Sequence, residues 1–101
     1  MKKTGKVNVH VYSDSEPEWE VTCLARLDTG AARTSIDIHL ADFLRLDGNG
    51  EVKVRNALGV EKRETVWLTL TVEGEEYTVE ASVSDRNGLS CPVLIGRDIL
   101  S

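Results

Sequence analysis

The sequence predicts an all-β protein, a barrel or sandwich of six or seven short strands with one short helix. Apolar residues alternate with polar ones in several segments, which is the period of a half-buried strand, and glycine-containing turn signals separate these segments. Valine, leucine and threonine are common and aromatic residues make up 5% of the chain, which tilts the composition toward β structure. A chain of 101 residues fits one domain, residues 1–101, with a single core.

Two alternating segments begin the chain. Val7, Val9 and Val11 alternate with polar residues and predict the first strand. After an acidic, proline-containing turn, a second strand is expected over residues 19–27. Asp28 follows in phase with the face opposite to the main apolar row, so we expect its side chain to point away from that row.

A sharp turn and a short helix are expected next. Gly30 gives the backbone freedom to turn directly after the aspartate. Apolar residues recur at helical spacing over residues 35–46, with Ser35 or Asp37 available as the N-cap, and predict a helix. Residues 47–50, Asp-Gly-Asn-Gly, predict a turn.

A long hairpin fills the middle of the chain. Its expected arms are residues 51–56 and 60–72, with Leu58 and Gly59 at a flexible tip. A second turn leads to a strand over residues 77–83. The continuous apolar run Val-Leu-Ile at residues 93–95 predicts a last strand that is covered on both faces.

The charge and hydropathy of the chain exclude several partners. The net charge is −5, whereas nucleic-acid binding needs a clustered positive surface, so we expect no nucleic-acid partner. No apolar run approaches the roughly 20 residues that span a bilayer, and the N-terminus lacks the apolar segment of a signal peptide. We therefore expect a cytoplasmic protein with no membrane partner.

The cysteine and histidine residues do not predict a cofactor site. Cys23 and Cys91 fall in apolar segments, where reduced cysteines are favoured over a disulfide, and a metal site is favoured least because paired ligand spacings are absent. His10 and His39 are interpreted as surface or helix residues, because a catalytic zinc needs about three protein ligands. A glycine-rich phosphate loop with a lysine is absent from the sequence, so we expect neither a metal nor another cofactor.

Residues 28–30, Asp-Thr-Gly, admit two interpretations. In the first, the carboxylate forms an Asx turn and caps nearby backbone N–H groups. In the second, the carboxylate carries chemistry, because the triplet closes an apolar strand and a similar strand end, Leu-Ile-Gly at residues 94–96, recurs late in the chain. The combination of the two strand ends favours the second interpretation.

With these two motifs the sequence resembles the retroviral-type aspartic proteases, the retropepsin-like family. The matching stretches are residues 27–31, Leu-Asp-Thr-Gly-Ala, and residues 94–100, Leu-Ile-Gly-Arg-Asp-Ile-Leu. Arg-Thr-Ser at 33–35, Ser-Asp-Arg at 84–86 and Cys-Pro at 91–92 extend the likeness to a bacterial and archaeal branch labelled ATP-dependent zinc protease. The resemblance covers residues 18–100 and implies a closed barrel of the acid-protease fold, with a flap hairpin and one or two short helices.

The resemblance implies hydrolysis of peptide bonds by a pair of carboxylates. Two carboxylates about 3 Å apart cannot both ionise, so they share a proton and titrate as a pair. The ionised one takes a proton from a water that attacks the peptide carbonyl, and the protonated one polarises that carbonyl. Because the chain carries one such triplet, we expect the second Asp28 from another copy across a two-fold axis. The expected protein is a homodimeric aspartic endopeptidase that acts on a peptide or protein substrate.

The resemblance also implies roles for residues around Asp28. Thr29 would hydrogen-bond across the two-fold axis, and Gly30 would present its backbone to the substrate. Gly96 and Arg97 would support the loop, and the partner of Arg97 is left open because Ala32 stands where retroviral proteases carry an acidic residue. The implied flap spans residues 56–62. The further candidates for substrate contact are Ala31, Ala32, Leu58, Gly59, Leu89, Pro92 and Leu94, of which the last three could instead be core packing.

Arg26 and Arg33 depart from the retroviral pattern, in which the matching positions are typically apolar and acidic. Arginines at these positions would favour a peptide that carries carboxylates, through charge-assisted and bidentate contacts. The frequent pairing of the bacterial branch with glutamate-ligating enzymes is in keeping with acidic, glutamate-rich peptides. The alternative is that both arginines make ion pairs within the chain.

A non-catalytic dimerisation or peptide-binding module on the same fold is the competing function. Retroviral proteases continue past the Gly-Arg helix into a strand that interleaves at the dimer interface, whereas this sequence stops at Ser101. A phosphotransfer aspartate is disfavoured, because the chain is short, is all-β in pattern and lacks the lysine of an Asp-Lys-Thr-Gly motif.

Overall fold

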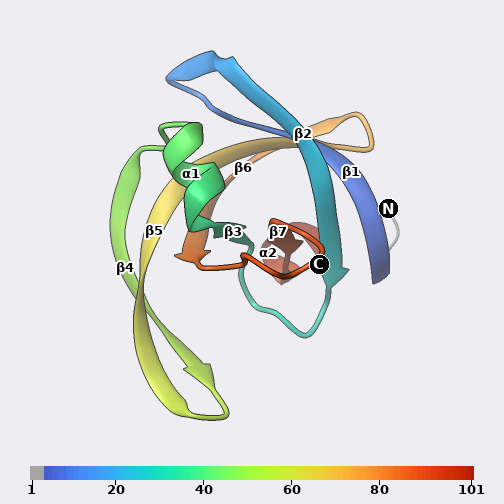
Figure 1. Ribbon diagram of the computed structural model, residues 1–101. Helices are drawn as coiled ribbons and strands as arrows, with labels where there is room; N and C mark the ends of the chain where they lie inside the picture. Colours follow the sequence, from blue (N-terminus) through green and yellow to red (C-terminus); the bar gives the residue numbers. More distant parts are fainter. Residues whose placement is uncertain (1–3) are drawn as a thin grey trace.

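The computed structural model describes residues 4–101, with the backbone alone for Asn56, and its strands form one closed sheet (Figure 1). The strand order is β1-β2-β7-β3-β6-β5-β4, and β1 also pairs with β5, so the sheet closes into a ring with β4 outside it. The strands are β1 (Thr4–Ser13), β2 (Glu16–Asp28), β3 (Ser35–Asp37), β4 (Gly48–Asn56), β5 (Gly59–Val72), β6 (Glu75–Ser84) and β7 (Val93–Ile95). Two short helices, α1 (Ile38–Phe43) and α2 (Arg97–Leu100), complete the structure. The predicted closed all-β fold with a hairpin and short helices is confirmed.

The interior of the ring is apolar because alternation along each strand turns every second side chain inward. Val9 and Val11 of β1 and Leu68 and Leu70 of β5 have no exposed surface. The two strands pair antiparallel with Val11 opposite Leu70, so their apolar rows meet inside the ring. Burial of one such side chain stabilises the fold by about 1.5–3 kcal/mol, and these rows hold the ring closed.

The central strand β7 brings the two sequence motifs to one edge of the sheet. It pairs parallel with β2, with Leu27 opposite Ile95, and antiparallel with β3 on its other side. Since β2 and β7 run in the same direction, Asp28 and Gly96 follow them at the same edge. Ile95 is fully buried as predicted for a covered strand, whereas Leu94 is half-buried and faces a cavity described below.

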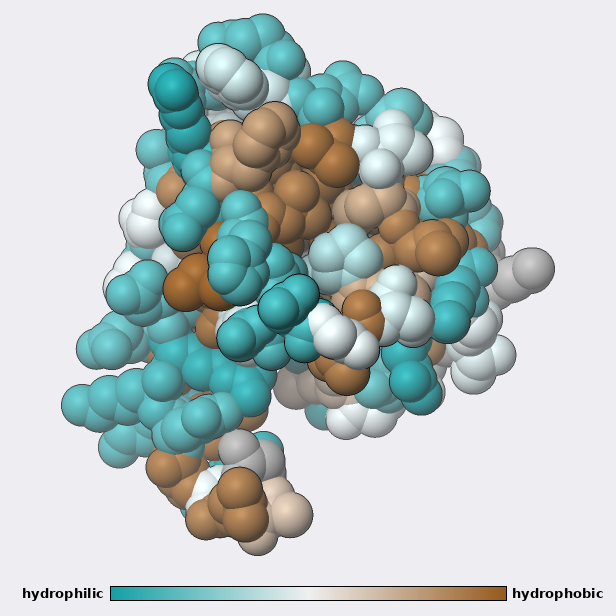
Figure 2. Space-filling view, in the orientation of Figure 1, coloured by the Kyte–Doolittle hydropathy of each residue, from teal (hydrophilic) through white to brown (hydrophobic). Residues whose placement is uncertain are grey.

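The strands β4 and β5 form a hairpin that extends beyond the ring (Figure 1). Asn56 pairs with Gly59, which leaves Ala57 and Leu58 as the turn. The Leu58 side chain is 99% exposed at this tip. Figure 2 shows the hairpin as a hydrophilic arm that ends in an apolar tip. The hairpin and its tip therefore lie where the sequence predicts them.

The turn predicted at residues 47–50 is wrong, because the structure places the beginning of β4 there. Gly48 pairs with Val66 and Gly50 pairs with Thr65, so the residue between the two glycines is the extra residue of a β-bulge. Gly50 has a φ of 107°, a conformation that glycine adopts at little cost. The glycines of this stretch therefore serve a bulge inside a strand instead of a reversal of the chain.

The helix predicted over residues 35–46 is shorter than expected. Its first three residues form β3, which pairs with β6 and β7, and α1 begins after Asp37. The Asp37 carboxylate is the N-cap and accepts from the backbone N–H groups of His39 at 3.0 Å and Leu40 at 3.4 Å. The spacing of Ile36 and Leu40 is misleading, because Ile36 reaches the core from a strand. In the part of the chain that the structure describes, no helix is long and apolar enough to cross a membrane.

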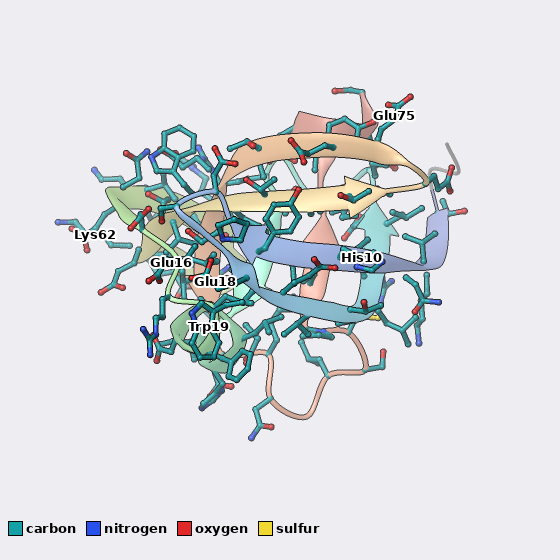
Figure 3. The ribbon with its side chains drawn as sticks, turned by 90° about the horizontal axis from the view of Figure 1, so that it is seen from above. His10, Glu16, Glu18, Trp19, Lys62 and Glu75 are labelled. Carbon is teal, nitrogen blue, oxygen red and sulfur yellow. The ribbon has the colours of Figure 1, made fainter. Side chains whose placement is uncertain are left out.

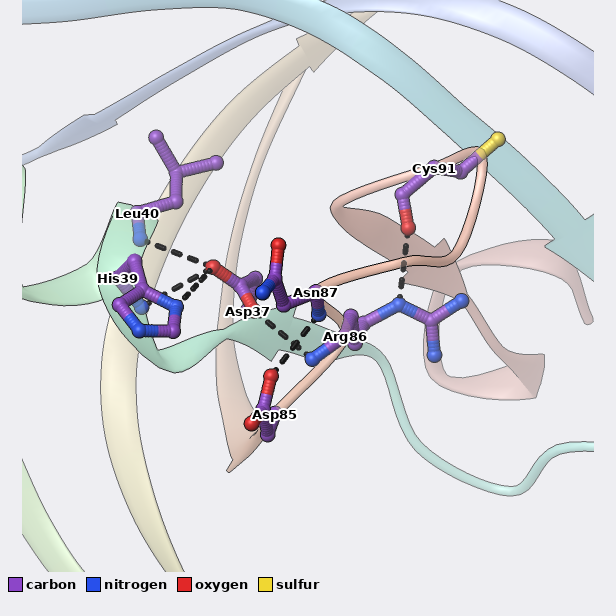
Figure 4. A network of polar contacts seen from close by, with 7 residues as sticks. All are labelled: Asp37, His39, Leu40, Asp85, Arg86, Asn87 and Cys91. Atoms are coloured by element: carbon purple, nitrogen blue, oxygen red, sulfur yellow. Dashed lines mark hydrogen bonds and ion pairs between the residues drawn. The ribbon is translucent and has the colours of Figure 1, made fainter.

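The N-cap carboxylate is expected to make stability depend on pH. Burial would raise the pKa of Asp37, but hydrogen bonds from the backbone of Arg86 and Leu40, and from the ring and backbone of His39, outweigh burial and lower this pKa (Figure 4). Such a group contributes stability above its unfolded-state pKa, and that stability is lost as pH falls through the folded-state pKa.

We therefore expect the free energy of unfolding from urea titrations to fall as pH drops from about 5 to about 3. Asp37→Asn removes the titrating group but leaves an amide oxygen to cap α1, so the wild-type advantage over this variant should shrink across the same interval. A wild-type advantage that stays constant from about pH 5 to about pH 3 would contradict the assignment.

Candidate functional site

The loop after β2 holds the Asp28 carboxylate in a fixed position. The backbone N–H of Gly30 donates to Asp28 Oδ1 at 2.8 Å, and the N–H of Ala31 donates to the Asp28 carbonyl at 3.2 Å. The Asx turn, the first of the two interpretations of residues 28–30, is therefore present. It engages one carboxylate oxygen, and no other hydrogen bond to this half-exposed carboxylate comes from the described residues. The second oxygen remains available for chemistry.

The N-terminal residues of α2 brace both ends of this loop. The backbone N–H of Arg97 donates to the Ala31 carbonyl at 2.8 Å, and Arg97 Nη1 donates to the Thr29 carbonyl at 2.9 Å. The Asp98 carboxylate accepts from the Thr34 backbone N–H at 2.9 Å and from its hydroxyl at 2.7 Å. The partner that the sequence left open for Arg97 is therefore a backbone carbonyl next to Asp28.

Two glycines allow this close packing. A Cβ on Gly96 would lie 2.7 Å from the Arg33 carbonyl carbon and 2.8 Å from the Ala31 carbonyl oxygen, distances that real Cβ atoms do not show. A Cβ on Gly30 would lie 3.0 Å from Asp28 Oδ1. A side chain at the first position would therefore displace the loop backbone, and one at the second would press on the carboxylate.

A cavity of about 500 Å³ lies between this loop and the hairpin. Loop residues Gly30, Ala31 and Ala32 line it together with Leu94 of β7. Six of the described residues that line it are basic and none is acidic. The basic residues are Arg33, Lys53, Arg55, Arg63, Arg86 and Arg97.

The positive cavity contrasts with the net charge of −5 for the whole chain. Acidic side chains such as Glu16 and Glu18 project from the start of β2, at the opposite end of that strand from Asp28 (Figure 3). Closer to the cavity, Glu80 pairs with Arg33 and Glu61 pairs with Arg63, and the four other basic residues of the lining give the cavity a positive charge that attracts an anionic ligand.

A smaller pocket of about 260 Å³ lies directly beside Asp28. Its wall includes Arg26, Arg86, Leu89 and Leu94, and Asp28 is the one acidic residue among the described residues that line it. Arg86 and Leu94 line both this pocket and the larger cavity, so the two spaces adjoin. A third pocket of about 290 Å³ places Thr29 and Asp28 against the start of β1.

The two arginines singled out by the sequence differ in their contacts. Arg33 Nη1 lies 2.5 Å from Glu80 Oε1 and also donates to the Glu80 carbonyl at 3.3 Å, so Arg33 makes the intramolecular ion pair that was the alternative for it. Asn49 of β4 donates to the other oxygen of the same carboxylate. Arg26 has no ion-pair partner among the described residues, and it is an exposed residue that lines a pocket together with Asp28.

The structure gathers most of the predicted site residues but leaves some apart. Leu58 and Gly59 lie at the far hairpin tip, and Pro92 is half-buried with its carbonyl bonded to the Asp37 N–H at 2.8 Å. None of these three lines the cavities described here. The basic residues that the hairpin and the β6–β7 connection contribute are not among the site residues predicted from the sequence. They are Lys53, Arg55, Arg63 and Arg86, of which the first two could have been noticed from their alternate spacing on one strand.

Three side chains could in principle hold a metal ion, but their local contacts already account for them. Asp37, His39 and Asp85 offer ligand atoms within 4.8 Å of one another. Both oxygens of Asp37 accept backbone N–H groups, and Asp85 Oδ1 accepts from the Asn87 N–H at 2.9 Å (Figure 4). These contacts are the caps of a helix and a turn, so no metal role is assigned to the cluster.

The other candidate ligands lie apart from this cluster. His10 is on the outer face of β1 with Nδ1 2.5 Å from Glu20 Oε1 (Figure 3). Cys23 and Cys91 are free thiols. Burial, together with the nearby Cys91, raises the pKa of Cys23 to about 11, so its thiol is protonated at neutral pH and is a weak nucleophile.

Comparison with solved structures supports the fold. EIAV protease in complex with the inhibitor HBY-793 superposes with a TM-score of 0.67 over 99% of this chain and 88% of that chain, at 18% identity. The simian foamy virus protease gives a TM-score of 0.62 over 91% and 89% of the two chains, at 14% identity. Lpg0085 from Legionella pneumophila, a DUF785 protein of unknown function, gives 0.55 over 92% and 82%, at 18% identity.

At these identities the likeness concerns the fold. No family model matches the chain, and no curated protein matches its sequence. The closed ring of six strands, its projecting hairpin and the short helix after β7 align with 88% of the EIAV protease chain. The chain therefore has an all-β fold of the retropepsin-like, or acid-protease, type.

Proposed function

We propose that this chain is an aspartic endopeptidase in which two copies each contribute Asp28. The observation that carries the proposal is the placement of this carboxylate. It is half-exposed, fixed by the Gly30 N–H, held on a loop that Arg97 braces, and beside a pocket adjoining a cavity beneath the hairpin. A preorganised carboxylate at such a place can act on a bound water.

The proposed chemistry needs a second carboxylate. Asp28 is the one acidic residue among the described residues that line the cavity and the adjoining pocket, so one copy cannot supply a dyad. In a two-fold dimer the two Asp28 groups would share a proton. One would take a proton from the water that attacks the peptide carbonyl, the other would polarise that carbonyl through the shared proton, and the proton taken from the water would pass to the leaving amine as the peptide bond breaks. The hairpin of each copy would cover the bound peptide and exclude water.

We further propose that the substrate is an acidic peptide, cut in the cytoplasm. The six basic side chains of the cavity support this preference, because two of them have a counter-charge within the chain, Glu80 on Arg33 and Glu61 on Arg63, and carboxylates of the substrate would neutralise the others. The motifs at residues 33–35, 84–86 and 91–92 support assignment to the bacterial and archaeal branch of the family. The zinc and ATP in the label of that branch form no part of the proposal.

Dilution of the enzyme tests the dimer. We expect the specific activity on an unstructured glutamate-rich peptide to fall at low protein concentration, because dimers dissociate by mass action. Two copies joined by a flexible linker should keep their activity on dilution. Activity should survive a chelator and should show an acidic, bell-shaped pH profile. Full activity in a protein that sediments as a monomer would contradict the proposal, and binding without cleavage would favour the non-catalytic peptide-binding module.

A further inference from the structure

We propose that the pocket of about 260 Å³ beside Asp28 is a subsite for a carboxylate side chain of the substrate, which Arg26 and Arg86 would hold. This inference rests on the proposed function and adds where the acidic residue binds. Because the catalytic carboxylate itself lines the pocket, cleavage would fall directly next to an acidic residue, rather than merely somewhere within an acidic peptide.

Arg86 is fixed in place with part of its guanidinium unused. Its Nε donates to the Cys91 carbonyl at 3.0 Å, and its backbone N–H donates to Asp37 Oδ1 at 2.8 Å (Figure 4). The two terminal nitrogens make no hydrogen bond with the described residues. A guanidinium that is anchored at Nε and free at its terminal nitrogens can bind a carboxylate with little loss of conformational freedom.

The charges of the pocket favour an anion. Arg26 and Arg86 bring two positive charges, and Asp28 brings at most one negative charge. Burial lowers the pKa of Arg86, the nearby Cys91 and Asp37 act in the opposite direction, and the positive charges of Arg26 and Arg63 lower it further, so Arg26 and Arg86 repel each other. A carboxylate placed between them would relieve this repulsion. In the proposed dyad the two Asp28 groups share a proton, which reduces their repulsion of an acidic substrate further.

The walls of the pocket suit the rest of such a side chain. Leu89 and Leu94 line it and offer contacts to methylene groups. Arg33 is less suited to bind a substrate carboxylate, because its guanidinium already forms an ion pair with Glu80. Arg26 and Arg86 can therefore bind a substrate carboxylate, whereas Arg33 is already paired with Glu80.

A pair of peptides that differ by glutamate or glutamine at a residue flanking the scissile bond tests the subsite. The measured quantity is the ratio of kcat/KM for the two peptides. We expect the wild-type dimer to prefer glutamate by about ten- to a hundredfold, as a charge-assisted hydrogen bond allows, and Arg86→Gln to bring the ratio to within about threefold. Arg86→Lys keeps the positive charge but loses the planar guanidinium that can donate two hydrogen bonds to one carboxylate, so it should retain part of the preference for glutamate.

Arg45→Gln is the matched control. It removes the same charge from a side chain whose guanidinium lies 4.8 Å from the Trp19 ring, outside both cavities, so the ratio should stay at the wild-type value. Unfolding midpoints of all variants check that the loop around Cys91 remains folded. A folded Arg86→Gln protein that still prefers glutamate tenfold would overturn the subsite.

Two outcomes separate this inference from the proposed function. Cleavage that is equally fast for both peptides in the wild type would leave the endopeptidase standing and remove the subsite. If no peptide is cut, anisotropy with fluorescent peptides tests the subsite alone. Tighter binding of the glutamate peptide that is lost in Arg86→Gln would then support the pocket while the endopeptidase fails.

Discussion

Replacing Asp28 with asparagine is expected to lower peptide hydrolysis by about four orders of magnitude or more, because both the general base and the general acid of the proposed dyad disappear. The fold should survive the change. The amide oxygen can still accept the Gly30 N–H that the Asp28 carboxylate now accepts at 2.8 Å. We therefore expect kcat to fall while the unfolding midpoint stays close to that of the wild type.

Asp42→Asn is the control for this variant, because Asp42 is an exposed carboxylate on α1 and lines neither cavity. It should leave the rate unchanged. Mixing adds a test of the shared site. A threefold excess of the Asp28→Asn protein should leave about one sixteenth of the dimers as wild-type pairs once subunits exchange. Activity that does not fall on mixing would show that each copy works alone.

Gly96→Ala is expected to unfold or strongly destabilise the protein. The added Cβ would lie within 2.8 Å of backbone atoms of Ala31 and Arg33, and backbone cannot move aside as a flexible side chain does. We expect a loss of at least about 3 kcal/mol in the free energy of unfolding, which lowers the unfolding midpoint of a domain of this size by more than about 10 °C. Thermal unfolding followed by circular dichroism measures the change.

Gly48→Ala is the matched control, since a Cβ at Gly48 would meet no atom within 4 Å. Its effect should stay within about 1 kcal/mol, because the same substitution here brings no clash. If Gly96→Ala proved as stable as Gly48→Ala, the close packing of α2 on the loop would be incorrect.

The strands and the hairpin could be predicted from the sequence because alternation is a local signal. The helix was predicted too long, because Ile36 and Leu40 have helical spacing although Ile36 belongs to β3, whose partners β6 and β7 are far away in sequence. The glycines at 48 and 50 predict a turn where the structure has a bulge, for a similar reason. A glycine indicates that the backbone can adopt an unusual conformation, but the pairing with β5 decides whether that conformation forms a turn or a bulge.

For the candidate site, the sequence predicted the loop with Asp28 but few of its contacts. Arg97 binds backbone carbonyls, which carry no sequence signal, and the pairing of Arg33 with Glu80 joins residues 47 positions apart. The basic lining of the cavity depends on the hairpin folding over the loop, which brings Lys53 and Arg55 next to residues 30–33. These contacts between distant segments depend on how the strands close into a ring, and the pattern of a single sequence does not show that arrangement.

The position of β7 in the middle of the sheet has a consequence for the order of folding. Residues 93–95 insert between β2 and β3, and Arg97 and Asp98, which follow them, bind the Asp28 loop at Thr29, Ala31 and Thr34. Contacts across so long a sequence separation form late, after the entropy of closing the intervening chain has been overcome. A growing or truncated chain that lacks these residues would hold the Asp28 loop by its contacts with β6 alone, without the hydrogen bonds to Thr29 and Ala31 that lie next to the carboxylate.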